Sequence, residues 1–179
     1  MNEKPHILIC GDVGAGKSTL IRRLLLQMDL PIYGYITKRL DNDADGFHPI
    51  YIHPAGQPTE QRVHTDENLI GTCNRKIHNI RLNVFDTLGA QYIRSARPGG
   101  VIVMDELGFM EAEAHAFTDA VFAALDGDTH VIAAVKSRTD VPFLDSVRRC
   151  PKARLFYITE GNRDALCKEV FPYVQNWSR

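Results

Sequence analysis

The sequence has only four cysteines, and no two of them form a closely spaced CxxC pair. Disulfide scaffolds and zinc knuckles depend on such spacings, so we expect neither class of protein. Long apolar runs are also missing, because the longest one near the N-terminus, residues 7–10, is far too short for a membrane span or a signal-peptide core. These absences predict a cytoplasmic protein with no membrane partner. The cysteines are Cys10, Cys73, Cys150 and Cys167.

An excess of charge of one sign is absent as well, because 21 basic residues stand against 22 acidic ones in a chain of 179. Binding to nucleic acid through overall charge needs a basic excess, so we expect no nucleic-acid partner. The sequence also lacks internal repeats and linkers rich in glycine and serine. We therefore predict that residues 1–179 form one domain, present as a monomer or a weakly associating oligomer.

Short apolar runs alternate with segments of helical periodicity along the chain. The runs have the length and composition of buried parallel strands, and the segments between them repeat their apolar residues at helical spacing. Strands separated by helices in this order predict an α/β fold with a mainly parallel sheet flanked by helices. The predicted strands are residues 6–10, 32–37, 101–104, 131–135 and 155–158. The predicted helices are residues 17–27, 82–97, 113–125, 141–149 and 161–170.

Residues 47–80 depart from this alternation. A dense cluster of turn formers, Asp-Asn-Asp-Ala-Asp-Gly at residues 41–46, precedes Phe47, Ile50 and Ile52. This pattern predicts a small β-hairpin insertion that projects from the main sheet. The periodicity is weakest from residue 55 onward, where we expect only short strands and loop, so residues 47–80 are predicted to be an excursion from the single domain.

A glycine-rich turn between the first predicted strand and the first predicted helix carries the clearest chemical signal. Residues 11–18, Gly-Asp-Val-Gly-Ala-Gly-Lys-Ser, match the pattern GxxxxGK[ST] in full. In such a loop, main-chain N–H groups and the helix N-terminus point at phosphate oxygens. We expect Lys17 to reach the β- and γ-phosphates of a nucleoside triphosphate and to act in catalysis, and Ser18 to bind Mg²⁺. The predicted nucleotide-binding residues of this loop are Gly11, Asp12, Val13, Gly14, Ala15, Gly16, Lys17, Ser18 and Thr19.

The predicted strand at residues 101–104 runs directly into two acidic residues, Asp105 and Glu106. Ligands of open α/β sheets bind at the carboxyl ends of the strands, where a Walker B aspartate holds Mg²⁺. We therefore predict Asp105 as a metal ligand. Glu106 is then a carboxylate beside the metal that can orient a water molecule or take its proton, which favours hydrolysis over transfer to another acceptor. Without the glycine-rich loop upstream, the same pair would fit a helix cap equally well.

Four short segments occur together and in a distinctive order. They are residues 11–19, Gly-Tyr-Ile-Thr at 34–37, Asp-Glu-Leu-Gly-Phe-Met-Glu at 105–111 and Ile-Thr-Glu-Gly-Asn-Arg-Asp at 158–164. On these segments the chain resembles the small P-loop nucleoside-triphosphatases first described from thermophiles, a family with a human cancer-related nucleoside-triphosphatase. The resemblance covers most of the chain, although residues 55–95 match poorly.

The resemblance implies a P-loop fold of the additional-strand type, in which another strand lies between the phosphate-loop strand and the Walker B strand. The predicted strand at residues 131–135 is the natural candidate for that position. The resemblance also implies Mg²⁺-dependent hydrolysis of ATP, GTP and other nucleoside triphosphates to the diphosphate, with loose base specificity. Two positions depart from the family pattern, because Phe109 stands in place of a lysine and Arg39 in place of a glutamate. The first departure implies slower turnover or a cation from another position.

A cation that faces the γ-phosphate accelerates phosphoryl transfer by stabilising the charge that develops there. Lys38, Arg39, Lys136 and Arg138 are candidates for this role. We predict Arg138 as a catalytic residue, because it lies just beyond the carboxyl end of the predicted strand at 131–135. An arginine supplied by a protein partner or by a second copy of the chain is the alternative.

Asn162 and Arg163 open the last predicted helix, in a region that often borders the base in P-loop folds. An amide and a guanidinium can bond to a base or stack on it, so we predict both as nucleotide-binding residues. A helix N-terminus capped by the asparagine, with a solvated arginine, fits the pair equally well.

Two other functions stay open on the sequence, and a nucleoside triphosphate is the substrate in both. A small-molecule or nucleotide kinase would need an acceptor pocket, of which residues 47–64 could form one wall. A nucleotide-dependent switch with slow hydrolysis would need a protein partner, and the excursion or the basic segment at residues 136–154 offers a surface for one.

Overall fold

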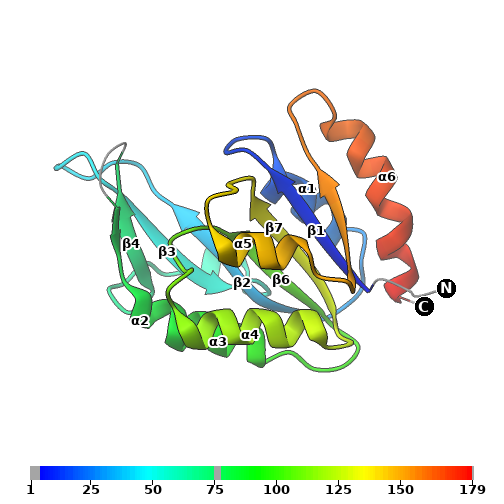
Figure 1. The fold of residues 1–179 in the computed structure, drawn as a ribbon. Helices are drawn as coiled ribbons and strands as arrows, with labels where there is room; N and C mark the ends of the chain where they lie inside the picture. Colours follow the sequence, from blue (N-terminus) through cyan, green and yellow to red (C-terminus); the bar gives the residue numbers. More distant parts are fainter. Residues whose placement is uncertain (1–4, 75–77, 179) are drawn as a thin grey trace.

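The computed structural model describes residues 5–74 and 78–178 of the chain. Its strands are β1 (His6–Gly11), β2 (Ile32–Arg39), β3 (His48–Pro54), β4 (Leu69–Cys73), β5 (His78–Ile80), β6 (Val101–Leu107), β7 (His130–Lys136) and β8 (Ala153–Tyr157). Its α-helices are α1 (Lys17–Leu25), α2 (Leu82–Val84), α3 (Ala90–Arg94), α4 (His115–Asp126), α5 (Pro142–Arg148) and α6 (Arg163–Gln175). Within these residues the strands form one sheet in the order β5-β4-β3-β2-β6-β7-β1-β8 (Figure 1).

The central part of the sheet is parallel, from β2 through β6, β7 and β1 to β8. Strand β7 lies between β1, which leads into the glycine-rich loop, and β6, which leads into the acidic pair. This order confirms the predicted α/β fold and the additional strand at residues 131–135. Since neighbouring parallel strands end at the same edge, β1, β6 and β7 bring their carboxyl ends together there.

The predicted hairpin region continues the main sheet. Strand β3 pairs antiparallel with β2, β4 with β3, and β5 with β4, and we call these three added strands the antiparallel extension. Here the arrangement differs from the projecting hairpin that we expected. The physical reason is that β2 ends the parallel part of the sheet, and β3 pairs with the main-chain groups that an edge strand would leave open. Residues 75–77 of the predicted excursion, like residues 1–4 and 179 of the predicted domain, lie outside the described part.

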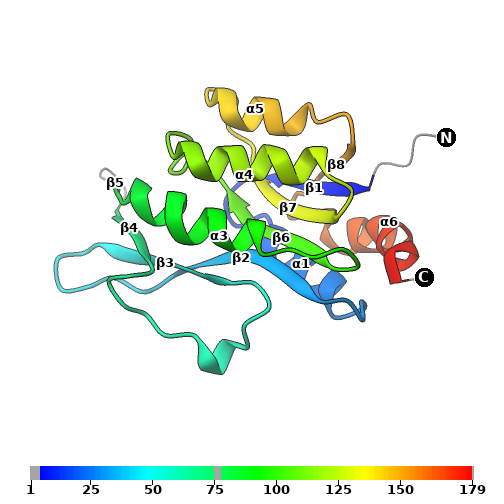
Figure 2. The same ribbon diagram turned by 90° about the horizontal axis from the view of Figure 1, so that it is seen from below.

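Helices cover both faces of the sheet (Figure 2). Alternate residues of each parallel strand point to opposite faces, so each strand contributes to two cores. On one face Leu8 and Met104 belong to the core that contains residues of α3, α4 and α5. On the other face Ile9 and Val103 belong to the core that contains residues of α1 and α6. None of the helices in the described ranges is long and apolar enough to cross a membrane.

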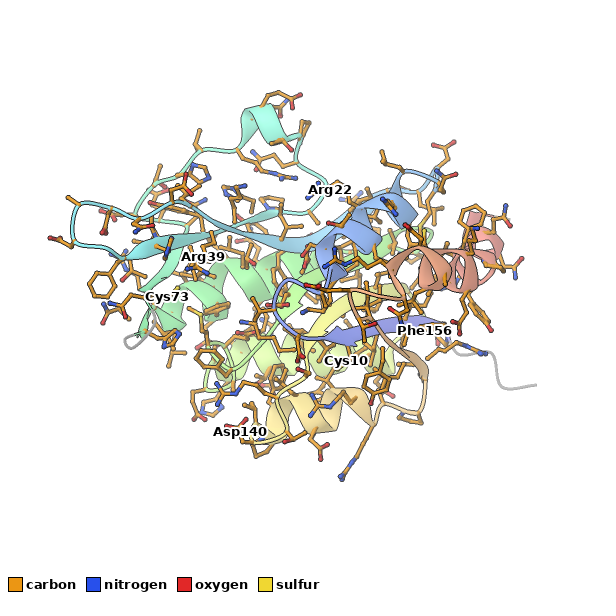
Figure 3. All side chains as sticks on the ribbon, turned by 90° about the horizontal axis from the view of Figure 1, so that it is seen from above. Cys10, Arg22, Arg39, Cys73, Asp140 and Phe156 are labelled. Carbon is orange, nitrogen blue, oxygen red and sulfur yellow. The ribbon has the colours of Figure 1, made fainter. Side chains whose placement is uncertain are left out.

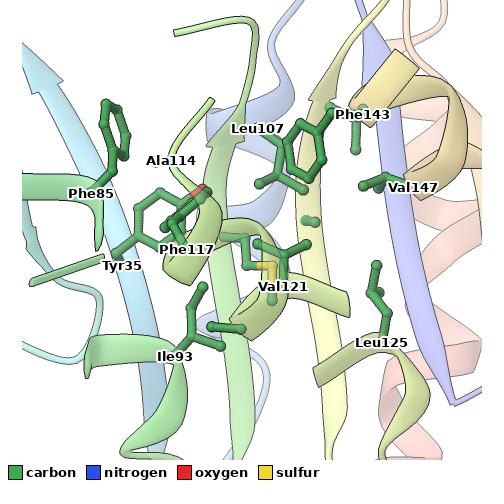
Figure 4. Packing of buried hydrophobic residues seen from close by; sticks show 14 of the residues in the cluster. Tyr35, Phe85, Ile93, Leu107, Ala114, Phe117, Val121, Leu125, Phe143 and Val147 are labelled. Atoms are coloured by element: carbon green, nitrogen blue, oxygen red, sulfur yellow. The ribbon is translucent and has the colours of Figure 1, made fainter. Parts of the chain in front are cut away.

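A cluster of three aromatic rings in the first core packs β2 against α4 and the segment between α2 and α3 (Figure 4). The ring of Phe117 in α4 lies edge-on to those of Tyr35 in β2 and Phe85, with centroids 5.4 Å away in both pairs. Phe85 begins a π-helical turn, Phe85–Gly89, that joins α2 to α3 within the segment predicted as one helix. A side chain at Gly89 would meet the Phe117 ring at 2.7 Å, so this position needs glycine. The cluster therefore fixes β2, which carries two groups of the site described next.

Candidate active site

The glycine-rich loop connects β1 to α1 and closes around the side chain of its own lysine. Gly14 and Gly16 have φ angles of 80° and 105°, which side chains with a Cβ rarely adopt. Lys17 opens α1 and is only 4% exposed. Its Nζ donates hydrogen bonds to the main-chain oxygens of Gly11 at 2.7 Å and Asp12 at 2.8 Å. The lysine is thus held inside the loop.

The carboxyl end of β6 brings the predicted acidic pair to this loop. The Ser18 hydroxyl donates a hydrogen bond of 2.8 Å to Oδ1 of Asp105, although the two residues are far apart in the sequence. Oε2 of Glu106 lies 3.0 Å from Nζ of Lys17. The structure therefore places together the four residues Lys17, Ser18, Asp105 and Glu106 that sequence reasoning assigned to phosphate, metal and water.

Asp105 is buried, at 9% exposed, and offers a carboxylate next to a serine hydroxyl. Burial raises the pKa of this carboxyl to about 6, against the opposing effect of the hydrogen bond from Ser18. A hydroxyl and a carboxylate are hard oxygen donors, the kind that Mg²⁺ prefers. The donor set at Ser18 and Asp105 therefore fits a magnesium ion.

Two residues of β2 support the acidic pair from behind. The Thr37 hydroxyl donates to the main-chain oxygen of Asp105 at 3.2 Å, and the Tyr35 hydroxyl donates to that of Glu106 at 3.3 Å. Tyr35 is fully buried in the aromatic cluster, so the packing of the core helps to fix the position of the acidic pair. Sequence reasoning did not assign a role to either side chain. Their place in the Gly-Tyr-Ile-Thr segment was the signal that could have identified them.

Lys136, at the end of β7, is the second cation that contacts Glu106, with Nζ 3.3 Å from Oε1. Its backbone pairs with Gly11, so the register between β1 and β7 sets it beside the phosphate loop. Arg138, the predicted catalytic cation, lies elsewhere: its guanidinium bonds to Asp140 at 2.5 Å and stacks over the ring of Phe109 at 4.7 Å. The structure thus brings Lys136 to the acidic pair and leaves Arg138 in an exposed ion pair.

Arg163 bonds to main-chain oxygens of the glycine-rich loop, and Asn162 bonds to the main chain of the turn between β8 and α6. The Asn162 amide accepts a hydrogen bond from the N–H of Thr159 and donates one to the oxygen of Tyr157. Arg163 donates from Nε to the oxygen of Ala15 at 2.6 Å and from a terminal nitrogen to that of Gly14 at 2.5 Å. The Arg163 contacts brace the glycine-rich loop and the Asn162 contacts fix the turn before α6. A contact of either residue with the base stays a prediction.

Two adjoining cavities open at this edge of the sheet. One, of about 320 Å³, is lined by the loop and by Lys17, Ser18, Asp105 and Glu106. The other, of about 420 Å³, lies between the starts of α1 and α6 and shares Gly16 and Thr19 with the first. The first of these adjoining cavities suits a chain of phosphates, and the second suits a ribose and base. Val13 and Gly14 also line the first cavity, and Asp12 and Ala15 lie in the turn between β1 and α1.

Glu111 is a buried acid just behind the site, 3% exposed, and it accepts a short hydrogen bond from the N–H of Gly108. Burial raises the pKa of its carboxyl from 4.5 to about 7. Since the folded protein then holds this proton more tightly than the unfolded chain does, the contribution of Glu111 to stability is lost as pH rises from 4.5 to about 7.

We predict that Glu111→Gln removes this pH dependence. The free energy of unfolding of the variant, relative to that of the wild type, should rise by up to about 3 kcal/mol between pH values of about 4.5 and 7.5. Urea unfolding at a series of pH values measures the difference, with Glu113→Gln at an exposed position as control. A difference that stays constant with pH would contradict the assignment.

The fold and the site together define a class of protein. A parallel sheet with an additional strand, a glycine loop that closes on a lysine, and an acidic pair at the end of the neighbouring strand make up a P-loop nucleoside-triphosphate-binding domain. The ammonium groups of Lys17 and Lys136 both lie beside Glu106 at this edge of the sheet.

Comparison with known proteins agrees with this class. A family model described as NTPase matches residues 6–171. The nucleoside-triphosphatase THEP1 of Methanothermobacter thermautotrophicus is 31% identical over 177 residues, covering 96% of this chain and 97% of the relative. The THEP1 of Thermotoga petrophila is 28% identical over 185 residues, covering 97% and 94%. The crystal structure of THEP1 from Aquifex aeolicus matches with a TM-score of 0.74 at 22% identity, over 95% of this chain and 99% of that chain, which supports the fold.

The chain belongs to this NTPase family, and it is an enzyme that hydrolyses nucleoside triphosphates.

Proposed function

We propose that the enzyme hydrolyses ATP, GTP and other nucleoside triphosphates to the diphosphate, with Mg²⁺ held by Ser18 and Asp105 and with loose base specificity. The observation that carries the proposal is the placement of one carboxylate, Glu106, between two ammonium groups at the mouth of the phosphate loop. In that place the carboxylate can act on a water molecule while the ammonium groups act on the phosphate.

The proposed reaction assigns one task to each group. Main-chain N–H groups of the loop bind the phosphate oxygens, and Lys17 contributes its ammonium group to the β- and γ-phosphates. When bound, Mg²⁺ neutralises charge on the phosphate oxygens. A water oxygen attacks the γ-phosphorus, Glu106 takes the water proton, and the bond between the γ-phosphorus and the bridging oxygen breaks. Lys136 stabilises the negative charge that develops on the γ-phosphate.

Loose base specificity is expected because polar side chains near the second cavity are already bonded to other groups of the protein. Arg23 pairs with Asp164 at 3.0 Å, and Arg163 is bonded to the phosphate loop. The Asn162 amide is occupied by the main chain of its own turn. Strong discrimination between bases needs groups that hydrogen-bond to base edges, and these four side chains already have other partners.

Phosphate release from ATP, GTP, CTP and UTP tests this proposal. With magnesium present, we expect the four values of kcat/KM to lie within about a hundredfold of one another. This is the range typical of a site without dedicated base contacts. EDTA should reduce all four to background. Activity that survives EDTA, or one nucleotide preferred far beyond that range, would contradict the metal or the specificity proposal respectively.

Replacing Lys136 tests which cation serves the γ-phosphate. We predict that Lys136→Met lowers kcat by about tenfold to a thousandfold while KM changes little, because the ammonium acts on charge that develops during the reaction. The matched variant Arg138→Met removes a cation that is bound to Asp140 and should lower kcat less. Steady-state phosphate release measures both. A larger loss in the arginine variant would restore Arg138 as the catalytic cation.

A further inference from the structure

A third cavity lies beyond the phosphate cavity, on the side away from the expected base position. It measures about 440 Å³ and shares Val13, Thr37 and Glu106 with the phosphate cavity. The cavity between α1 and α6 shares only loop and α1 residues with the phosphate cavity, so the three lie in a row. A nucleotide that fills the first two leaves this one, which we call the distal cavity, beyond its terminal phosphate.

The lining of the distal cavity combines apolar side chains with cationic and acidic ones. Its volume lies in the range of small-molecule sites, and apolar side chains with a few polar groups are the usual lining of such sites. The apolar wall comes from β3 and β4, from the π-helical turn and from the loop after the acidic pair. Its members are Ile50, Ile70, Phe85, Phe109 and Met110. The cationic residues of the lining are Arg39 and Lys136, and the acidic ones are Glu106 and Glu111.

Arg39 presents a guanidinium at the edge of this cavity. The residue is exposed at the end of β2, and among the described residues no carboxylate forms an ion pair with it. Figure 3 shows Arg39 and Cys73, another residue of the lining, at the same end of the molecule. A guanidinium binds carboxylate and phosphate groups through paired N–H donors, so it suits an anionic group on the occupant.

Phe109 forms a fixed part of the wall. Its ring lies under the Lys136 ammonium at 5.4 Å and under the Arg138 guanidinium at 4.7 Å, and the ring of His78 meets it edge-on at 5.1 Å. Phe109 and Arg39 therefore line one cavity, where an aromatic ring and a guanidinium can contact the same occupant.

We propose that the distal cavity binds a small organic alcohol with an apolar ring and an anionic group, and that its hydroxyl can accept the terminal phosphoryl group in place of water. The proposal rests on the proposed function, since it uses the same nucleotide site. The anionic group, a carboxylate or a phosphate, binds Arg39, and the ring packs on Phe109 and the apolar wall.

The transfer uses the groups already assigned to hydrolysis. Glu106 lines both cavities, so the carboxylate that acts on water also faces a hydroxyl in the distal cavity. The alcohol oxygen forms a bond to the γ-phosphorus, and its proton passes to Glu106. The bond from the γ-phosphorus to the bridging oxygen breaks, and the nucleoside diphosphate leaves. The occupant also displaces water from the mouth of the phosphate cavity, so hydrolysis falls as transfer rises.

The test uses ATP labelled at the γ-phosphate, magnesium and two probes, 4-(hydroxymethyl)benzoate and 4-(hydroxymethyl)phenylphosphonate. We expect label in an organic phosphate ester of at least one probe, and the preferred probe tells whether Arg39 favours a carboxylate or a phosphate-like anion. The analogue 4-methylbenzoate lacks the hydroxyl and should lower phosphate release without taking label. Label found only in inorganic phosphate with both probes at millimolar concentration would overturn the proposal.

A pair of variants assigns the effect to the distal cavity. Arg39→Ala should reduce labelling of the preferred probe by about tenfold or more at low probe concentration, the loss expected for one charge-assisted hydrogen-bonding pair. Arg97→Ala removes an exposed arginine between α3 and β6 and should retain wild-type labelling. Equal labelling in the two variants would place the probe elsewhere and overturn the proposal. Absence of phosphate release from ATP alone would instead refute the proposed function.

Discussion

The variant Glu106→Gln should lose nearly all turnover while it still binds nucleotide. Glutamine keeps the shape of the side chain but cannot take a proton from water, and a general base contributes about a hundredfold to ten thousandfold in rate. We therefore expect kcat to fall by about that factor. The dissociation constant for ATP, measured with magnesium present, should change far less, because the main chain of the loop and Lys17 still hold the phosphates.

Two measurements separate loss of chemistry from loss of structure in this variant. Glu106 forms ion pairs with Lys17 and Lys136, so its neutralisation also changes the charge around the loop. Calorimetric titration with the nucleotide reports binding, and thermal unfolding reports the fold. The exposed Glu60→Gln gives the matched control for the substitution itself. A wild-type kcat in Glu106→Gln would show that another group prepares the water.

The variant Lys17→Met should lose affinity for nucleoside triphosphates as well as turnover. The ammonium is buried and bound to two main-chain oxygens and to Glu106, in the position where the triphosphate is expected. Removing one partner from a buried, charged contact costs about 2–5 kcal/mol, which corresponds to at least about thirtyfold in affinity. Methionine retains the length of the side chain, so the loop loses charge rather than volume.

Binding of a fluorescent, non-hydrolysable ATP analogue measures this loss. The control Lys168→Met removes an exposed lysine from α6 and should bind as the wild type does. Lys17 also satisfies the oxygens of Gly11 and Asp12, so the melting temperature must be measured beside the affinity. Unchanged affinity in a folded Lys17→Met protein would mean that the loop does not hold the phosphates through this residue.

The parallel core and the phosphate loop could be predicted from the sequence because their signals are local. Buried parallel strands need continuous apolar residues, such as 101–104 and 131–135, and the glycine loop requires its residues at fixed spacing. The acidic pair was also predictable, since a strand that ends in Asp105 and Glu106 delivers them to the ligand-binding edge. The direct hydrogen bond between Ser18 and Asp105 was not predictable from the sequence, because only the fold brings these two distant residues together.

The remaining features depend on pairing and register, which local patterns do not encode. The antiparallel extension continues the sheet because β3 pairs with the open edge of β2. The turn-forming residues before β3 do not indicate which strand it pairs with. Lys136 reaches Glu106 because its backbone is paired with Gly11, whereas Arg138, two residues later, is drawn to Asp140. Both cations are present in the sequence, and only the register between β1 and β7 determines which of them contacts Glu106. The distal cavity likewise combines residues that are distant in the chain.

Hydrolysis of ATP in the presence of magnesium, in water enriched in oxygen-18, tests the central claim most directly. The account holds that a water molecule, prepared by Glu106, attacks the terminal phosphorus of a triphosphate bound to the loop. With enzyme in excess over nucleotide and no other acceptor present, mass spectrometry should find one solvent oxygen in each phosphate released and none in the diphosphate. Solvent oxygen in the diphosphate, or no release of phosphate at all, would contradict the account.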